Sequence, residues 1–176
     1  MKKFELTSEF VTFLGKKLFR IKALVAFGGV KEGELGGFVE KEENLDQSGD
    51  AWVSGNARVS GNAWVSGDAR VSGDARVSGN AWVSGNARVS GNTWVSGNAW
   101  VQCCRDYSAA SCFGSENRTT TFFRTKDDGI GVRCGCFYGT LEEFREKVKE
   151  RHGDSRLAKE YLMLADAMEF RLSKDE

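Results

Sequence analysis

The chain lacks an excess of either charge. Its 176 residues include 25 Lys and Arg against 25 Asp and Glu, so the formal net charge is zero. Proteins that bind duplex DNA through its phosphates usually carry a basic excess, and mimics of DNA carry an acidic one. The balance argues against both classes, and the length suits one domain or one repeat array with small caps.

The chain also lacks a long apolar run. The longest near the N-terminus covers residues 23–27, whereas a membrane-spanning helix needs about 20 apolar residues. Met1-Lys2-Lys3 leads into a strand-like alternation instead of the apolar region of a signal peptide. These features predict a cytoplasmic protein that does not bind membranes. The five cysteines lie between Cys103 and Cys136, and an odd number in a reducing compartment predicts free thiols.

Residues that carry catalysis are scarce. The one histidine, His152, precedes Gly153, a position typical of a helix end where the side chain interacts with the dipole. No Walker-type loop or Gly-x-Ser-x-Gly motif occurs. Cys134 and Cys136 are expected on one side of a strand, but paired Cys-x2-Cys knuckles are missing, so buried free cysteine is favoured over zinc. The sequence predicts no catalytic residue, no metal and no cofactor.

What the sequence has is a six-residue unit. From Val53 to Trp100 it repeats eight times as Val-Ser-Gly-Asn/Asp-Ala-Trp/Arg, with Thr93 the one replacement of Ala, and residues 47–52 form a degenerate ninth copy. A short fixed period indicates a solenoid. Val and Ala are two positions apart and therefore point inward together, while the Trp or Arg between them points outward. Ser-Gly-Asn/Asp forms the corner.

This pattern resembles the hexapeptide-repeat family, whose fold is a left-handed parallel β-helix with three hexads per coil. The stretch from Ile21 to Val53 looks like the N-terminal region of bacterial and prophage hexapeptide-repeat proteins labelled putative transferases. The resemblance implies a mainly β protein, and the patterns along the chain divide it into three parts. They are an N-terminal β cap (1–34), a β-helix of about three to four coils (35–102) and a small C-terminal α+β module (103–176).

A coil of three hexads sorts the outward residues onto three faces. These are Trp64, Trp82 and Trp100; Arg58, Arg76 and Trp94; and Trp52, Arg70 and Arg88. An exposed apolar stripe usually marks a contact surface, so the first two faces are candidate oligomer interfaces. Family members are commonly trimers, which favours a homotrimer. Two alternatives remain: outward residues that are only good strand formers, or a face packed against the C-terminal helices.

The C-terminal part carries the candidate ligand site. Strands are expected at residues 119–125 and 130–138, followed by a helix opened by a capping box at Thr140 and a second helix after Gly153. Residues 114–126 combine hydroxyl groups and cations, which suit phosphate, with Phe122 and Phe123, which suit a base. The candidate ligand-binding residues are Ser115, Arg118, Thr119, Thr120, Thr121, Arg124 and Lys126. The alternative is an ordinary Thr-rich strand with solvated charges.

The region from Gly114 to Asp154 resembles the C-terminal region of phage-borne relatives of the repeat proteins. The resemblance suggests a non-catalytic, oligomeric, phage-encoded binding protein in the host cytoplasm. It would counter a bacterial defence by sequestering a nucleotide signal or by docking on a defence protein. Two rival classes are an acyl-CoA-dependent acyltransferase that uses His152 and a structural assembly protein. The family's catalytic His usually lies near a loop that projects from the coils, and no loop interrupts this repeat.

Overall fold

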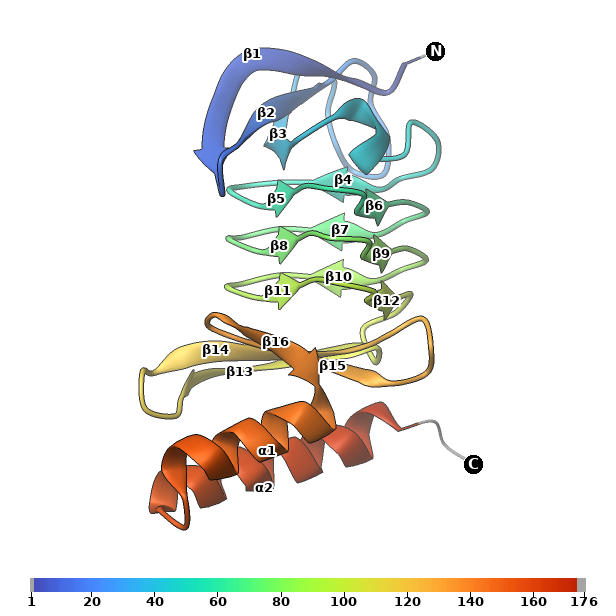
Figure 1. Cartoon of the computed structure of the whole chain (residues 1–176). Helices are drawn as coiled ribbons and strands as arrows, with labels where there is room; N and C mark the ends of the chain where they lie inside the picture. Colours follow the sequence, from blue (N-terminus) through green and yellow to red (C-terminus); the bar gives the residue numbers. More distant parts are fainter. Residues whose placement is uncertain (1, 174–176) are drawn as a thin grey trace.

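The computed structural model describes residues 2–173. Figure 1 shows a stack: N-terminal strands at one end, a β-solenoid in the middle, and a C-terminal sheet backed by two helices at the other end. The β-helix fold expected from the hexads is confirmed. No helix among residues 2–173 has the length and apolarity needed to cross a bilayer.

The N-terminal elements are β1 (Phe4–Phe13), β2 (Lys16–Ala23), β3 (Leu35–Val39) and the 3-10 turn η1 (Glu42–Asn44). Two-residue strands form the solenoid: β4 (Trp52–Val53), β5 (Arg58–Val59), β6 (Trp64–Val65), β7 (Arg70–Val71), β8 (Arg76–Val77), β9 (Trp82–Val83), β10 (Arg88–Val89), β11 (Trp94–Val95) and β12 (Trp100–Val101). The C-terminal elements are β13 (Tyr107–Phe113), β14 (Arg118–Arg124), β15 (Ile130–Cys134), β16 (Phe137–Thr140), α1 (Leu141–His152) and α2 (Arg156–Leu172).

The solenoid strands pair in parallel with the strand three hexads away. The strand orders are β5-β8-β11, β10-β7-β4 and β12-β9-β6, and β3 extends the first of them by pairing Phe38 with Arg58, 20 residues on. The register pairs Trp64 with Trp82 and Trp82 with Trp100. This is the stacking predicted from an uninterrupted coil of three hexads, and the composition of all three faces is confirmed.

The interior is a narrow column of Val and Ala. Every hexad Val is 0% exposed and every hexad Ala at most 1%. The corners stack backbone on backbone: a Cβ on Gly67, which has φ +64°, would lie 3.1 Å from the amide nitrogen of Gly85. Only Gly combines positive φ with so close an approach, which explains its recurrence in every hexad.

The N-terminal end of the solenoid is closed by polar groups. Lys3 is 4% exposed, and its ammonium group donates to the carbonyls of Ser48, Gly49 and Ala51 at 3.0–3.2 Å. Burial lowers the pKa of Lys3, while nearby acidic side chains oppose the shift. The buried Asn44 amide donates to two further coil carbonyls. An open parallel edge would otherwise offer these acceptors to another chain.

The C-terminal end is closed by the antiparallel sheet β13-β14-β15-β16. Successive residues of β14 point to opposite faces, so Phe123 joins the solenoid core while Phe122 packs beneath the helices. The Thr121 hydroxyl accepts from the amide of Trp94 at 3.1 Å, and Lys126 donates its amide to the carbonyl of Asn98. One sheet therefore joins the solenoid to the helical layer.

The helices follow their sequence signals. Thr140 and Glu143 form the expected capping box on α1, and Ser155 caps α2. Arg145 of α1 bridges Asp166 and Glu169 of α2 at 2.6 and 2.7 Å. Hydrogen bonds to Glu169 and then Asp166 raise the pKa of Arg145 above its ordinary value, which ties the two helices together.

One expectation about the cysteines is wrong. Cys134 ends β15, but Gly135 takes a positive φ of 58° and turns the chain toward β16. Cys136 therefore lies in this turn and is exposed, while Cys134 is partly buried. The strand expected over residues 130–138 is two strands with a tight turn between them.

Candidate functional site

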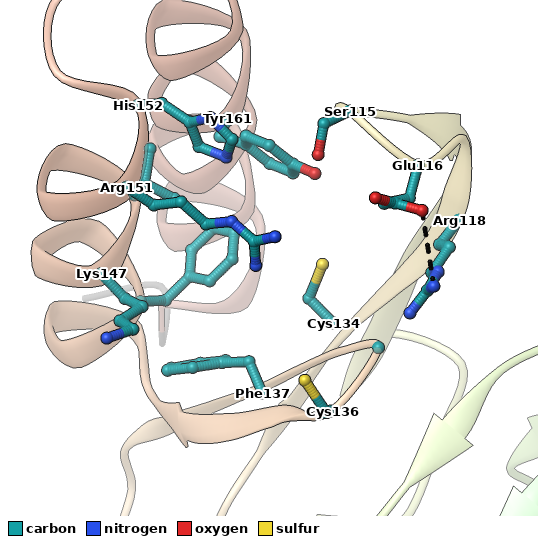
Figure 2. A pocket seen from close by; sticks show the side chains of 13 residues that line it. Ser115, Glu116, Arg118, Cys134, Cys136, Phe137, Lys147, Arg151, His152 and Tyr161 are labelled. Atoms are coloured by element: carbon teal, nitrogen blue, oxygen red, sulfur yellow. Dashed lines mark hydrogen bonds and ion pairs between the residues drawn. The ribbon is translucent and has the colours of Figure 1, made fainter.

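A pocket of about 300 Å³ opens between the C-terminal sheet and the helices. Figure 2 shows that the β13–β14 and β15–β16 turns form one side and helix α1 the other, with Tyr161 of α2 at the back. The lining residues are Ser115, Glu116, Arg118, Cys134, Gly135, Cys136, Phe137, Phe144, Lys147, Val148, Arg151, His152 and Tyr161. We call this cavity the C-terminal pocket.

The pocket has an aromatic wall. Phe144 lies 5.6 Å from Phe137 and 5.8 Å from Tyr161, measured between ring centroids. His152 stacks on Tyr161 at 5.7 Å with an interplanar angle of 24°. Rings locked against one another in this way form a rigid apolar surface, which is the usual lining of a small-molecule site.

Cations surround this wall. Arg118, Lys147 and Arg151 line the pocket, together with the single carboxylate Glu116. Figure 2 shows the Arg151 side chain reaching into the cavity and Lys147 at its rim. Arg118 pairs with Glu116 at 3.5 Å, both 57% exposed. Within residues 2–173, Arg151 forms no ion pair. The charge of the lining favours an anion.

The two thiols in the pocket are separated by the β15–β16 turn. The Cys134 sulfur accepts a hydrogen bond from the buried Thr120 hydroxyl at 3.2 Å, whereas Cys136 is exposed. No group of three or more His, Cys, Asp or Glu that could hold a metal occurs among the described residues.

The seven candidate ligand residues are spread over several environments. Ser115 and Arg118 line the C-terminal pocket. Thr119 lies with Arg118 in a second cavity beside the solenoid. Thr120 and Thr121 are 0% and 1% exposed, and their hydroxyls bond Cys134 and the Trp94 amide, so they are not open to a ligand.

The last two candidates lie elsewhere. Arg124 donates to the carbonyls of Leu172 and Ser173 and pairs with Asp106 at 3.7 Å, so it closes the C-terminal end of α2. Lys126 lines a cavity beside Trp100. The structure therefore brings two of the seven, Ser115 and Arg118, into the C-terminal pocket.

The aromatic rings assigned to a base were placed wrongly from the sequence. Phe122 and Phe123 are both 0% exposed and fill the two cores on either side of β14. The rings that line the pocket are Phe137, Phe144 and Tyr161. None of these rings was identified from the sequence as part of a site. The cations Lys147 and Arg151 were also missed, although they stand four residues apart on one helix face, a spacing that could have indicated a basic site.

The three solenoid faces differ in what covers them. Phe13 lies 5.2 Å from the guanidinium groups of both Arg58 and Arg76, and its ring is 6.1 Å from that of Trp94. On the third face, the ring of Trp52 packs against Phe4 and Phe27, and Trp52 is 2% exposed.

The face of Trp64, Trp82 and Trp100, here called the Trp ladder, stacks mainly on itself. Its ring centroids are 5.0 and 4.5 Å apart. Trp64 remains 39% exposed, and the Trp82 indole donates to the Ser66 hydroxyl. Of the six candidate interface residues, Trp64 is the exposed one, while Trp82 and Trp100 are half-buried and Trp100 lies beside the C-terminal sheet.

Comparison with known families agrees with this architecture. The model of the YdcK beta solenoid repeat family matches residues 48–67, 69–85 and 81–97. Together with the parallel coils, this match defines a β-solenoid repeat protein. No curated protein matches the chain.

Proposed function

We propose that this chain is a non-catalytic, self-associating binding protein that takes a nucleotide-type anion in the C-terminal pocket. The observation that carries the proposal is the juxtaposition of Arg118, Lys147 and Arg151 with the rings of Phe137 and Tyr161. Guanidinium and ammonium groups bind phosphate oxygens, and a flat aromatic surface stacks on a base.

The existing ion pairs of the pocket would yield to such a ligand. Arg118 and Glu116 are both more than half exposed, as are Lys147 and its partner Glu150. Exposed pairs of this kind contribute about 0–1 kcal/mol, whereas hydrogen bonds from a guanidinium to phosphate are bidentate and stronger. The volume of about 300 Å³ lies at the lower end for small-molecule sites.

The biological context of the proposal comes from the resemblance to hexapeptide-repeat proteins carried by phages. A phage-encoded protein with such a pocket would sequester a nucleotide signal of a bacterial defence system. Docking on a defence protein is the alternative within the same context, and it needs no ligand in the pocket.

Calorimetry with cyclic and ADP-ribose-type nucleotides tests sequestration. We expect heat with at least one of them and an affinity about tenfold lower in Arg151→Gln, because a charge-assisted hydrogen bond is lost. Arg156→Gln is the matched control, since Arg156 is an exposed residue that begins α2 and is not part of the pocket lining. No heat with any nucleotide would refute ligand sequestration.

We further propose that the Trp ladder joins copies of the chain, with a trimer as the expected size. The support is an apolar stripe on the solenoid while both solenoid ends are closed. Trp64→Arg places at this position the residue that other hexads use, so it keeps the repeat pattern and removes the apolar surface. Sedimentation should show dissociation in Trp64→Arg and an unchanged oligomer in Arg88→Gln; a wild-type monomer contradicts the proposal.

The rival candidate is an acyltransferase of the hexapeptide-repeat type. The observation that favours it is the presence of His152 in the pocket, stacked on Tyr161. Acetyl-CoA turnover that disappears in His152→Ala would support this rival and overturn the non-catalytic proposal.

A further inference from the structure

A second cavity lies between the solenoid and the C-terminal sheet, with a volume of about 430 Å³. Arg76 comes from β8, Arg118 from the start of β14 and Arg133 from β15. The corner residue Asn92, the turn residue Asn117 and Thr119 of β14 complete its polar lining. We call this cavity the arginine groove.

The arginine groove concentrates one sign of charge. Three guanidinium groups line it, and its lining contains no carboxylate among the described residues. Arg76 and Arg133 form no ion pair within residues 2–173. Three neighbouring cations repel one another unless an anion lies between them.

Aromatic rings hold two of these cations in place. The Arg133 guanidinium lies 3.8 Å from the centroid of the Trp94 ring, and the Arg76 guanidinium lies 5.4 Å from the same ring and 5.2 Å from Phe13. Cation–π contacts fix a guanidinium without using its N–H donors. The donors of both side chains therefore stay available to a ligand.

Two of these donors are unsatisfied inside the protein. The Nε atoms of Arg76 and Arg133 are buried and have no hydrogen-bond partner. Burial also lowers the pKa of Arg133, an effect that nearby Cys136 and Tyr138 oppose. Because these Nε atoms are closed off from the groove, a ligand there would meet the terminal Nη donors of the two guanidinium groups.

We propose that the arginine groove is a binding site for a multiply charged phosphate anion, of which inorganic pyrophosphate is the simplest probe. Guanidinium groups from three strands would contact its oxygens, and the amides of Asn92 and Asn117 with the Thr119 hydroxyl would supply neutral donors. The site is separate from the aromatic wall of the C-terminal pocket, and Arg118 is the arginine that lines both cavities.

Calorimetry of the full chain with inorganic pyrophosphate tests the proposal. We expect binding that weakens with added salt and falls about tenfold in Arg76→Gln and in Arg133→Gln, since each loses charge-assisted hydrogen bonds. Arg88→Gln is the matched control, because Arg88 is an outward repeat arginine on a different face. Arg133→Lys should recover only part of the affinity, because it keeps the charge and loses the planar fork.

Three outcomes would overturn the proposal: no pyrophosphate heat with the wild type, equal loss in Arg88→Gln, or full affinity in Arg76→Gln. Thermal unfolding would reveal whether Arg133→Gln folds. If it does not, Arg76→Gln alone tests the proposal, because Arg76 is partly exposed. Arg151→Gln separates this site from the proposed function. Pyrophosphate binding lost in Arg151→Gln but kept in Arg76→Gln would move the anion to the C-terminal pocket and leave the nucleotide proposal standing.

Discussion

At the scale of single residues, the corner glycines are required for two reasons: their positive φ, and the close approach of the next coil. The structure allows the two to be separated. Gly79 and Gly91 have nearly the same φ, +71° and +72°. A Cβ on Gly79 would lie 2.8 Å from the amide nitrogen of Gly97, whereas a Cβ on Gly91 meets nothing within 4 Å. The pair therefore distinguishes backbone conformation from coil stacking.

We expect Gly91→Ala to lower the free energy of unfolding by about 1–2 kcal/mol, the cost of a left-handed non-glycine residue. Gly79→Ala should cost clearly more, by roughly a further 1–3 kcal/mol, because the coils must also move apart. Urea denaturation of both variants measures the difference. Equal losses would show that stacking distance contributes nothing.

Glu40 links the N-terminal hairpin to the solenoid. Its carboxylate accepts from the amide of Gly61 at 2.6 Å and from the Lys16 ammonium at 3.0 Å. Burial alone would raise the pKa of Glu40, but these donors lower it below its ordinary value of 4.5. A carboxyl with a lowered pKa in the folded state stabilises the protein above its unfolded pKa, and this contribution is lost as pH falls through the folded pKa.

Glu40→Gln should therefore lower the melting temperature at pH 7 by a few degrees, equivalent to about 1 kcal/mol. The difference from the wild type should shrink as the pH falls below the ordinary pKa of 4.5 and through the lowered pKa of Glu40 in the folded protein. Thermal unfolding over this pH range measures it. A difference that is constant with pH would mean that the charge of Glu40 has no part in the effect.

At the scale of elements, the N-terminal segment stabilises the first coil through the hydrogen bonds of Lys3. Replacing Lys3 with Met keeps the aliphatic stem but leaves three coil carbonyls without their donor. We expect a loss of about 2–4 kcal/mol. Lys2→Met is the matched control, since Lys2 forms an exposed pair with Glu42 and should change stability by less than about 1 kcal/mol. Chemical denaturation of both variants decides.

Periodic elements could be predicted from the sequence because each hexad repeats the same local rules. Inward Val and Ala, corner glycines and the three faces all follow from a period that nothing interrupts, and the capping box of α1 is a local signal. Strand β13 was missed because Ser108-Ala109-Ala110-Ser111 lacks the β-branched residues that mark a strand. It forms because β14 offers it a partner.

The candidate site could be predicted only in part because it is assembled from distant segments. Ser115 and Arg118 carry a local signal of hydroxyl and charge, whereas Arg151 and Tyr161 join them only when the helices fold back over the sheet. Which of the adjacent Phe122 and Phe123 faces a ligand cannot be read from composition, since β14 is covered on both faces. Such information exists only in the tertiary arrangement.

At the scale of the whole molecule, the solenoid is a stack of equal coils between two fixed ends. Duplicating residues 59–76 would add one complete coil and keep every outward residue on its face, because the register advances by 18 residues. Duplicating only residues 71–76 would rotate all later hexads by one face. It would separate Trp64 from Trp82 and bring Trp82 beside Arg70 instead.

We expect the 18-residue duplication to fold with a melting temperature close to that of the wild type, since each repeat contacts only its neighbours. The six-residue duplication should unfold at a distinctly lower temperature, because the stacking of Trp82 on Trp64 and the hydrogen bond from Trp82 to Ser66 are lost. Differential scanning calorimetry compares the two. Equal stability would mean that register between the ends is not required.

The Trp ladder also gives the molecule an optical property. Indole rings held 5.0 and 4.5 Å apart at fixed tilts of 30° and 47° share their electronic excitation, and chirally arranged rings then produce paired bands of opposite sign in circular dichroism. Separated indoles in an unfolded chain produce no such bands. The coils therefore carry a built-in spectroscopic label by which their formation could be followed, without any added dye, while the helices are monitored independently.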